Sequence, residues 1–283
     1  MQIIDGKEIS NRVKQRVKDE ALALKSKGIT PTLAVVLVGD DKASQTYVAS
    51  KEKATIACDM GSVAHKLPAS TTQSELLALI ELLNADDSID GILVQLPLPK
   101  HIDTNSILEA IDPNKDVDGF HAINVGRLNS GLDGFVPCTP LGIMELLKAY
   151  NIEVSGKNAV VIGRSNIVGK PMAALLLNAG ATVTIAHSKT KDLAKVCQNA
   201  DIVVVAVGKP NFLKADMIRD GAIVIDVGIN RLDSGKLVGD CDYESVAPKC
   251  SMITPVPGGV GPMTIAMLLS NTLKSAKNRK LKG

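Results

Sequence analysis

Along the first third of the chain, segments with apolar residues at every third or fourth position alternate with short continuous apolar runs. The first helix is predicted over Glu8–Lys27, where apolar residues return every three or four positions and Gly28 can end the helix. Compact β-branched runs and further helical patterns then follow one another. The expected segments are a strand at Leu33–Val38, a helix at Lys42–Met60, a strand at Ser62–Leu67, a helix at Gln73–Asn84 and a strand at Gly91–Gln95. This alternation predicts an α/β domain.

A second alternation begins after Thr139-Pro140, which can cap a helix at Leu141–Tyr150. Its apolar runs are continuous, as is typical of strands that are buried on both faces of a parallel sheet. The expected segments are strands at Ala159–Ile162, Ile202–Val207 and Ala222–Val227, a helix at Val168–Leu177, and a last apolar helix at Thr264–Leu273. They predict a doubly wound, Rossmann-like domain.

Residues 112–140 are rich in Gly, Pro, Asp and Asn and show little periodicity, so they predict the boundary between the domains. The expected division is a first domain of residues 1–138 plus 262–283 and a second of residues 139–261. The predicted fold class is therefore two α/β domains, the second with a doubly wound parallel sheet, and a cleft between them.

Composition narrows the possible functions of this globular chain. The 283 residues are 45% hydrophobic and 22% charged, with a net charge of +2 and only 2% aromatic residues, which argues against base-stacking platforms for nucleic acid. The five cysteines form no C-x-x-C pair and predict reduced thiols, while the four histidines share no metal-ligand spacing. We expect no metal, no membrane-spanning segment and no signal peptide, and hence a cytoplasmic protein.

A glycine loop in the second domain predicts a dinucleotide site. In GRSNIVG, Gly163, Ser165 and Gly169 mark a turn that opens a helix, whose first amides can face a pyrophosphate. The following strand ends in His187-Ser188 rather than in the carboxylate that accepts from the ribose of NAD. Arg164 and Ser188 suit a 2′-phosphate instead, so the pattern favours NADP. The alternative is an ordinary strand-to-helix turn with Arg164 solvated.

Polar groups in the first domain could carry chemistry, although each has a simpler alternative. Tyr47 and Lys51 share one helix face, which could also be a solvated face. Gln95 follows a buried strand, where it could serve a ligand or cap a loop. KDVDG places Asp118 in a turn, and Asp and Gly are common in turns. The Gly- and Pro-rich loop Thr254–Thr264 could line a ligand or make a sharp turn.

The order of the motifs carries more information than any single motif. SQTYVASK, VQLPLP, KDVDGF, GRSNIVGKP, AHSKT, DVGIN and TPVPGGVGPMT occur along nearly the whole chain in that order. The chain in this respect strongly resembles the bifunctional methylenetetrahydrofolate dehydrogenase/methenyltetrahydrofolate cyclohydrolase family.

The resemblance implies roles for individual residues. Tyr47 would stack on the folate rings, Lys51 would act at the reacting carbon, and Gln95 would hydrogen-bond Lys51. Asp118 would accept from the pterin ring. The remaining implied folate contacts are Leu96, Pro257, Gly258 and Gly259, and the implied NADP contacts are Gly163, Arg164, Ser165, Ser188 and Ile229, with Thr139 nearby.

The resemblance also implies an activity and a setting. The expected enzyme is a cytoplasmic homodimer that oxidises 5,10-methylenetetrahydrofolate with NADP and hydrolyses the methenyl product to 10-formyltetrahydrofolate. It would supply one-carbon units, with purine biosynthesis among their uses. Two alternatives are a family member that retains only the dehydrogenase and a non-catalytic protein that senses dinucleotides.

Overall fold

The computed structural model describes residues 1–281, which fold into two compact units. Unit 1 comprises Met1–Asn11 and Thr139–Thr264, and unit 2 comprises Arg12–Cys138 with the chain from Ile265 onward. Each unit has its own parallel sheet with helices, which confirms the predicted class of two α/β domains. No helix within residues 1–281 is both long and apolar enough to cross a bilayer.

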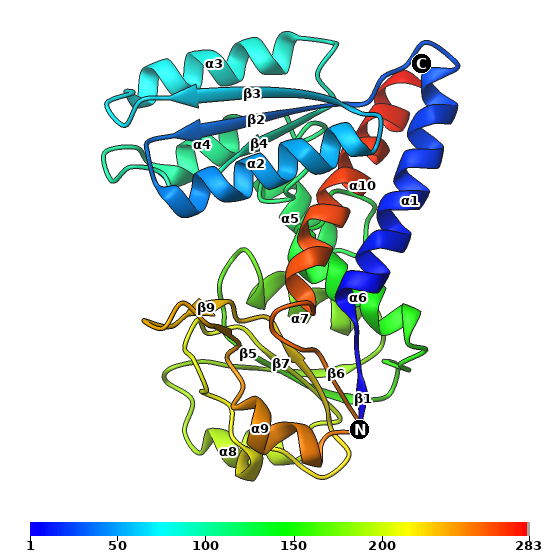
Figure 1. The fold of residues 1–283 in the computed structure, drawn as a ribbon, viewed down its shortest axis with the longest axis vertical. Coiled ribbons are helices and arrows are strands. Elements are labelled where there is room, and N and C mark those ends of the chain that lie inside the picture. Colours follow the sequence, from blue (N-terminus) through cyan, green and yellow to red (C-terminus); the bar gives the residue numbers. More distant parts are fainter. Residues whose placement is uncertain (282–283) are drawn as a thin grey trace. The chain divides into compact units, whose positions relative to one another are not determined.

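Unit 2 is built on a three-stranded parallel sheet in the order β3-β2-β4 (Figure 1). Strand β2 is central and almost completely buried. Its alternate residues Ala34, Val36 and Val38 pack into a core with α3, while Leu33 and Leu37 face the opposite side of the sheet. The elements are β2 (Thr32–Val38), α2 (Lys42–Ala57), β3 (Gly61–Leu67), α3 (Gln73–Ala85), β4 (Gly91–Val94), α4 (Thr104–Ala110) and α5 (Ala122–Asn129).

Unit 1 contains a six-stranded parallel sheet in the order β1-β11-β8-β7-β5-β6. The central strands β5, β7 and β8 are apolar and buried, as the continuous hydrophobic runs predict. The elements are β1 (Gln2–Ile3), α6 (Cys138–Ala149), β5 (Asn158–Ile162), α7 (Gly169–Asn178), β6 (Thr182–Ala186), α8 (Leu193–Gln198), β7 (Ile202–Val205), β8 (Ile223–Asp226), the hairpin β9 (Asn230–Arg231) and β10 (Leu237–Val238), α9 (Tyr243–Val246) and β11 (Met252–Ile253).

Two long helices, α1 (Gly6–Lys25) and α10 (Val260–Lys280), each contribute residues to both units. The two compact units therefore divide the chain at slightly different residues from the predicted first domain, residues 1–138 plus 262–283. Residues 1–11 belong to unit 1 because β1 pairs with β11, with Ile3 opposite Ile253. Residues 262–264 also belong to unit 1, and the Ser10 hydroxyl donates to the Pro262 carbonyl at 2.9 Å.

Several element boundaries differ from the prediction for local reasons. Helix α2 ends at Ala57 rather than at Met60, because Cys58 caps it and Asp59 takes a left-handed φ of 57°. The expected boundary segment, residues 112–140, contains α5, which begins at the side-chain cap of His121. Helix α10 starts at Val260, ahead of the predicted Thr264, and continues to Lys280.

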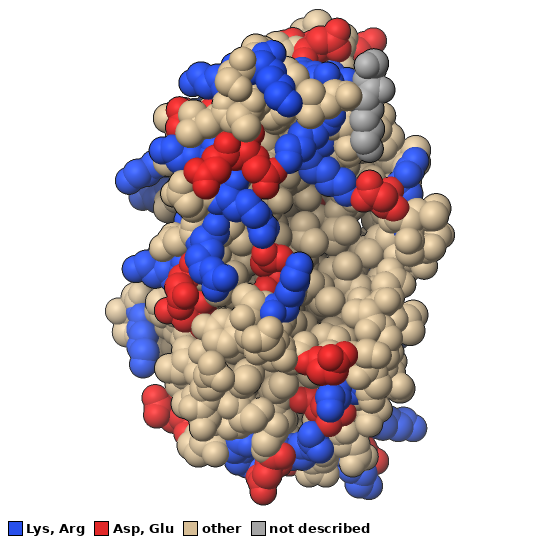
Figure 2. All heavy atoms as spheres, turned by 90° about the vertical axis from the view of Figure 1, so that its right-hand side faces the viewer, with Lys and Arg blue, Asp and Glu red and all other residues tan. Residues whose placement is uncertain are grey.

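Charged side chains of both signs are interspersed on the face drawn in Figure 2. This mixture matches a net charge of +2 in a chain with 32 basic and 30 acidic residues. A large surface of one sign, as nucleic-acid binding requires, is not visible on that face.

A buried carboxylate in unit 2 joins the sheet to the end of α10. Asp90 precedes β4 and is 0% exposed. It pairs with Arg279 at 3.0 Å and with Lys280 at 2.8 Å, and it accepts the Thr32 amide at 3.0 Å. Since removing one member of a buried ion network leaves the other charges unpaired, Asp90 stabilises the packing of α10 on the sheet.

We expect Asp90→Asn to lower the free energy of unfolding by about 3 kcal/mol, the usual loss when one partner of a buried pair is removed. The matched control is Asp87→Asn, since exposed Asp87 contacts the same arginine at 3.3 Å. That exposed pair contributes less than about 1 kcal/mol. Urea unfolding followed by circular dichroism measures both variants, and equal losses would contradict the assignment.

Candidate active site

The carboxyl edge of the sheet in unit 2 gathers the polar residues of the first two motifs. Gln95 directly follows β4, and its backbone N–H donates to the Val36 carbonyl of β2 at 2.8 Å. Asp116 forms an isolated parallel bridge with Ile92, so the chain before Asp118 runs alongside β4. Because parallel strands end at a common edge, Gln95 and Asp118 emerge on the same side of the sheet.

Helix α2 supplies Tyr47 and Lys51 to this edge. Asp41 caps the helix by accepting the Ser44 amide at 2.7 Å, which fixes where its turns begin. Four positions separate Tyr47 from Lys51, so they lie on one face, and Tyr47 is 47% exposed. A phenol ring that is free to contact a planar ligand therefore lies one turn from the lysine.

Lys51 and Gln95 form a direct hydrogen bond. The Lys51 ammonium donates to Gln95 Oε1 at 2.9 Å, and Gln95 Nε2 in turn donates to the Leu96 carbonyl at 2.6 Å. The second bond fixes which end of the amide faces the lysine. Lys51 is thus held at the sheet edge by a neutral acceptor, which leaves its charge uncompensated by this partner.

Asp118 is half-buried and interacts electrostatically with Lys51. Burial raises the pKa of the Asp118 carboxyl, the positive charge of Lys51 lowers it, and neighbouring Asp116 raises it further. The Cys138 thiol lies 3.6 Å from Asp118 Oδ1. Burial also raises the pKa of the Cys138 thiol well above its ordinary value, so the sulfur acts as a weak neutral donor.

Two buried charged residues, Lys115 and Asp116, hold the loop that carries Asp118. The Lys115 ammonium donates to the carbonyls of Leu83, Asn84 and Asp86, where it caps the carboxyl end of α3. Burial lowers the pKa of Lys115.

Asp116 anchors the following turn by accepting the amides of Phe120 at 3.2 Å and His121 at 2.9 Å. Asn124 Nδ2 also donates to it at 2.9 Å. Gly119 has a φ of 71°, and a Cβ there would lie 2.7 Å from the Pro137 nitrogen. The turn thus packs closely against residues 136–137. The motif KDVDG therefore both forms a turn and fixes the position of Asp118.

The glycine loop of unit 1 forms the predicted strand-to-helix turn between β5 and α7. Gly163 has a φ of 124°, and a Cβ at Gly169 would lie 2.2 Å from the Gly163 carbonyl oxygen. The Ser165 hydroxyl accepts the amides of Val168 at 3.2 Å and Gly169 at 3.3 Å. The first turn of α7 is thereby capped from within the loop.

The end of β6 lies next to this loop. The Gly163 amide donates to the Ala186 carbonyl at 2.8 Å, so Arg164 and Ser188 extend from neighbouring strands at one sheet edge. Both side chains are exposed. The residues after β6 carry Lys189 rather than a carboxylate, as the cofactor prediction requires.

The segment after β8 meets the Gly- and Pro-rich loop within unit 1. A Cβ at Gly261 would lie 3.1 Å from Ile229 Cδ1, so the isoleucine packs directly on the start of α10. The Lys7 amide donates to the Gly258 carbonyl at 2.9 Å, while Gly6 leaves room for the Gly259 carbonyl.

The predicted folate and cofactor residues are thus distributed over both units. Pro257, Gly258 and Gly259 share unit 1 with Ile229, and Tyr47, Lys51, Leu96 and Asp118 lie in unit 2. Thr139 belongs to unit 1, where its hydroxyl is 2.9 Å from that of Thr264.

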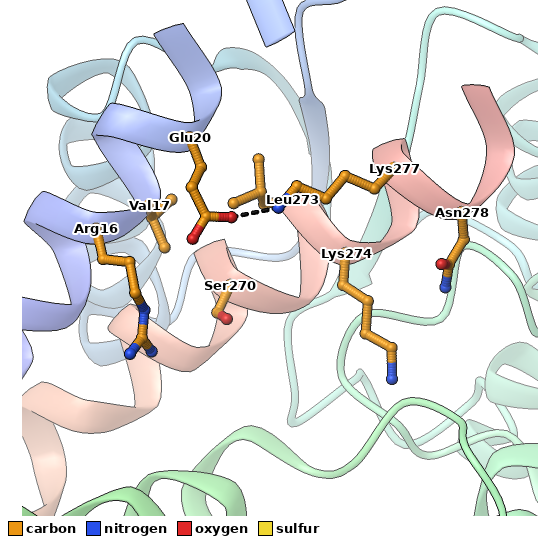
Figure 3. Close-up of a pocket in the computed structure, with 8 residues that line it drawn as sticks. All are labelled: Arg16, Val17, Glu20, Ser270, Leu273, Lys274, Lys277 and Asn278. Carbon is orange, nitrogen blue, oxygen red and sulfur yellow. Dashed lines mark hydrogen bonds and ion pairs between the residues drawn. The ribbon is translucent and has the colours of Figure 1, made fainter. Parts of the chain in front are cut away.

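A separate pocket of about 200 Å³ lies between α1 and α10 in unit 2 (Figure 3). Its lysines already have acidic partners, since Lys277 pairs with Glu20 and Lys274 with Asp133. Its lining contains none of the motif residues. Among residues 1–281, no group of three His, Cys, Asp or Glu is arranged to hold a metal ion.

Comparison with known proteins identifies the family. Residues 4–118 match the tetrahydrofolate dehydrogenase/cyclohydrolase catalytic domain, and residues 137–280 match the NAD(P)-binding domain of the same family. The chain belongs to the tetrahydrofolate dehydrogenase/cyclohydrolase family. The Lys51–Gln95 pair lies within the catalytic-domain match, and the Gly163 loop lies within the NAD(P)-binding match.

Similar members of this family are known across nearly the full length. A protein of Campylobacter fetus named bifunctional protein FolD is 79% identical over 280 residues, with 99% of each chain covered. The crystal structure of the bifunctional FolD enzyme of Campylobacter jejuni is 62% identical and has a TM-score of 0.98, with 99% of each chain covered. A Trypanosoma brucei enzyme complexed with NADP and an inhibitor is 41% identical, with a TM-score of 0.93 and 98% and 97% of the two chains covered.

We expect Arg164→Ala to weaken NADP binding by roughly tenfold to a hundredfold and to leave NAD binding almost unchanged, because only NADP offers a 2′-phosphate. Equilibrium titrations with both cofactors measure the effect. The matched control is Arg219→Ala, since Arg219 pairs with Asp201 at the amino end of β7, away from the loop. Equal losses for NADP and NAD would show that Arg164 supports the loop instead.

Proposed function

We propose that this protein is a bifunctional enzyme of one-carbon metabolism. It oxidises 5,10-methylenetetrahydrofolate to the methenyl form with NADP and hydrolyses the product to 10-formyltetrahydrofolate. Both domains of the dehydrogenase/cyclohydrolase family are present in the chain. The observation that carries the proposal is the Lys51–Gln95 hydrogen bond beside Asp118, since a dehydrogenase alone does not need an amine at this position.

The folate substrate is assigned to the carboxyl edge of the unit 2 sheet. Tyr47 offers an exposed ring for stacking on the pterin, and Asp118 offers a carboxylate to its ring donors. Leu96 adds an apolar contact beside Gln95. The backbone of Pro257, Gly258 and Gly259 is assigned to the same substrate.

The cofactor is assigned to unit 1. The residues fit NADP because the strand after the glycine loop lacks an acidic end and Arg164 and Ser188 stand at one sheet edge. Gly163 and Ser165 would hold the pyrophosphate at the start of α7, with Ile229 and Thr139 as further contacts. When bound, NADP accepts the hydride.

The oxidation needs little acid or base from the protein. Hydride departure from the methylene carbon leaves a cation that the two adjacent nitrogens stabilise with their lone pairs. The protein contributes orientation, which can account for a large part of the rate enhancement. Tyr47 and Asp118 supply this orientation by fixing the plane and the rotation of the pterin.

The hydrolysis makes a different demand. A water molecule adds to the methenyl carbon and loses a proton, and one carbon–nitrogen bond then breaks as the ring nitrogen gains a proton. The neutral amine of Lys51 is assigned to accept the proton of the water and then, as the ammonium, to return it to the ring nitrogen, with Gln95 holding the amine in place. Because the same group can take and return the proton, no second acid is required.

An absorbance assay tests both activities together. Purified protein is mixed with methylenetetrahydrofolate and NADP, and NADPH and the methenyl intermediate are followed separately. NADPH formation followed by decay of the methenyl absorbance is expected. NADPH with a stable methenyl product would indicate a dehydrogenase alone, while NADP binding without turnover would indicate a dinucleotide sensor.

We also propose that the enzyme is a cytoplasmic homodimer that supplies one-carbon units, including those for purine biosynthesis. All five cysteines are free and buried, which suits a reducing compartment. Edge strand β6 exposes Ile185 next to α7, where Leu177 is also exposed, and an apolar strand edge favours pairing with a second copy. Sedimentation analysis distinguishes a monomer from a dimer.

We expect Asp118→Asn to weaken folate binding by about 1 to 3 kcal/mol, because an amide donor would face a pterin donor in a desolvated site. NADP binding should be unchanged, since Asp118 lies in the other unit. Titration with a folate substrate analogue measures the first effect, with Asp87→Asn as the control. Normal folate affinity and two intact activities would remove Asp118 from the site.

We expect Lys51→Met to slow the hydrolysis by roughly 10²- to 10⁴-fold, the usual contribution of a general acid or base. The hydride step should slow less, so the methenyl intermediate should accumulate in single-turnover absorbance. Lys53→Met is the matched control, because exposed Lys53 lies on the same helix. Parallel loss of both rates would mean that Lys51 only positions substrate, and an unchanged hydrolysis rate would assign the proton to another group.

A further inference from the structure

The loop after β7 has three consecutive backbone amides that all donate to one side chain, Asp240. The amides of Val207 and Gly208 donate to Asp240 Oδ2 at 2.6 and 2.9 Å, and that of Lys209 donates to Oδ1 at 2.9 Å. Asn230 Nδ2 also donates to Oδ1, at 2.9 Å. Asp240 is 0% exposed, so its carboxylate depends on these four protein donors in place of water.

A second buried carboxylate, Asp226, connects the same segments. It accepts the amides of Gly228 at 2.9 Å, Asp240 at 2.8 Å and Cys241 at 2.8 Å. Asp226 is the last residue of β8, so the chain around Asp240 is held against the loop that carries Ile229. Asp240 therefore joins the loops that follow two neighbouring strands.

Two glycines make this arrangement possible. A Cβ at Gly228 would lie 2.3 Å from Asp240 Oδ1, and a Cβ at Gly239 would lie 1.9 Å from Asp226 Oδ2. The Asp240 carboxylate is thus packed against Gly228, and the Asp226 carboxylate is packed against Gly239. Both approaches are too close for any side chain, so the two strand-end segments are built around these carboxylates.

The sheet order places the loop after β7 at the reversal of strand order, where doubly wound sheets bind dinucleotides. From β5 the chain proceeds to β6 on one side and then to β7 on the other, so the strand order reverses between β5 and β7. Ligands of doubly wound sheets bind at the carboxyl ends of strands at this reversal. A Cβ at Gly163 would lie 2.2 Å from the Ala206 carbonyl, so the loops after β5 and β7 are in contact.

We propose that Asp240 is a positioning residue for NADP, holding residues 206–209 and the segment around Ile229 as one wall of the cofactor site. The glycine loop after β5 forms the other wall. This inference rests on the proposed use of NADP by unit 1. Asp240 makes no contact with the cofactor, since its carboxylate is fully occupied by protein donors.

The test is Asp240→Asn, with NADP affinity and amide hydrogen exchange as readouts. Each Asp240 oxygen accepts two donors, so either orientation of an asparagine places its NH₂ against two N–H groups. We expect NADP affinity to fall by roughly tenfold or more and folate affinity to stay unchanged. The amides of residues 207–209 should exchange faster in the cofactor-free variant. Asp233→Asn, in an exposed turn of the same unit, is the matched control.

A milder variant keeps the test decisive if Asp240→Asn does not fold. Asn230→Ala removes one of the four donors and should weaken NADP by roughly twofold to tenfold. Wild-type affinity for NADP in the folded variants, or equal losses for NADP and folate, would overturn the inference. Failure of the unmodified protein to bind NADP would instead reject the proposed cofactor.

Discussion

Buried carboxylates that accept backbone amides hold the loops on which this protein depends. At the carboxyl ends of parallel strands the backbone leaves the sheet, and its donors lose their ladder partners. In unit 2, Asp116 accepts two amides of the turn after Asp118. In unit 1, Asp226 and Asp240 do the same for the segments after β7 and β8. The loops that carry the candidate site residues are therefore fixed by hydrogen bonds from backbone amides to buried carboxylates.

This way of holding loops fits a reaction that needs positioning more than reactive groups. The hydride transfer draws its stabilisation from the substrate nitrogens, so its rate depends chiefly on how precisely the bound rings are oriented. The proton-transfer role proposed for Lys51 is the exception, and its amine is itself held by a neutral amide whose other end is fixed to Leu96. A neutral acceptor orients the amine without adding a second ionisable group.

The fold can be predicted from local sequence patterns, whereas the candidate site residues depend on the order of motifs along the whole chain. Continuous apolar runs identify β5, β7 and β8, because strands buried on both faces tolerate few polar side chains. Helical spacing places Tyr47 and Lys51 on one face, and Gln95 follows β4, but both patterns also fit a solvated face or a loop cap. The KDVDG motif alone predicts a turn, and only the order of all the motifs makes Tyr47, Lys51, Gln95 and Asp118 candidate site residues.

The sequence pattern could not identify the supports of the site, because those depend on contacts between distant segments. Lys115 looks like a surface lysine beside two aspartates, yet it is almost completely buried under the end of α3. Residues 1–11 read as the start of the first domain, whereas the two-residue strand β1 pairs with β11 some 250 positions later. Such a short strand carries no periodicity of its own.

Asp240 is another residue whose role could not be predicted from the sequence pattern. In the sequence it stands in GDCDY beside another aspartate, and nothing in that spacing distinguishes a buried acceptor from a solvated charge. The distinction comes from Gly228 and Gly239, whose missing side chains admit the two carboxylates. A glycine next to an acidic residue is usually explained by a turn. Here each glycine is explained by the carboxylate of the other segment, and this pairing links the loops after β7 and β8 at the carboxyl edge of the sheet.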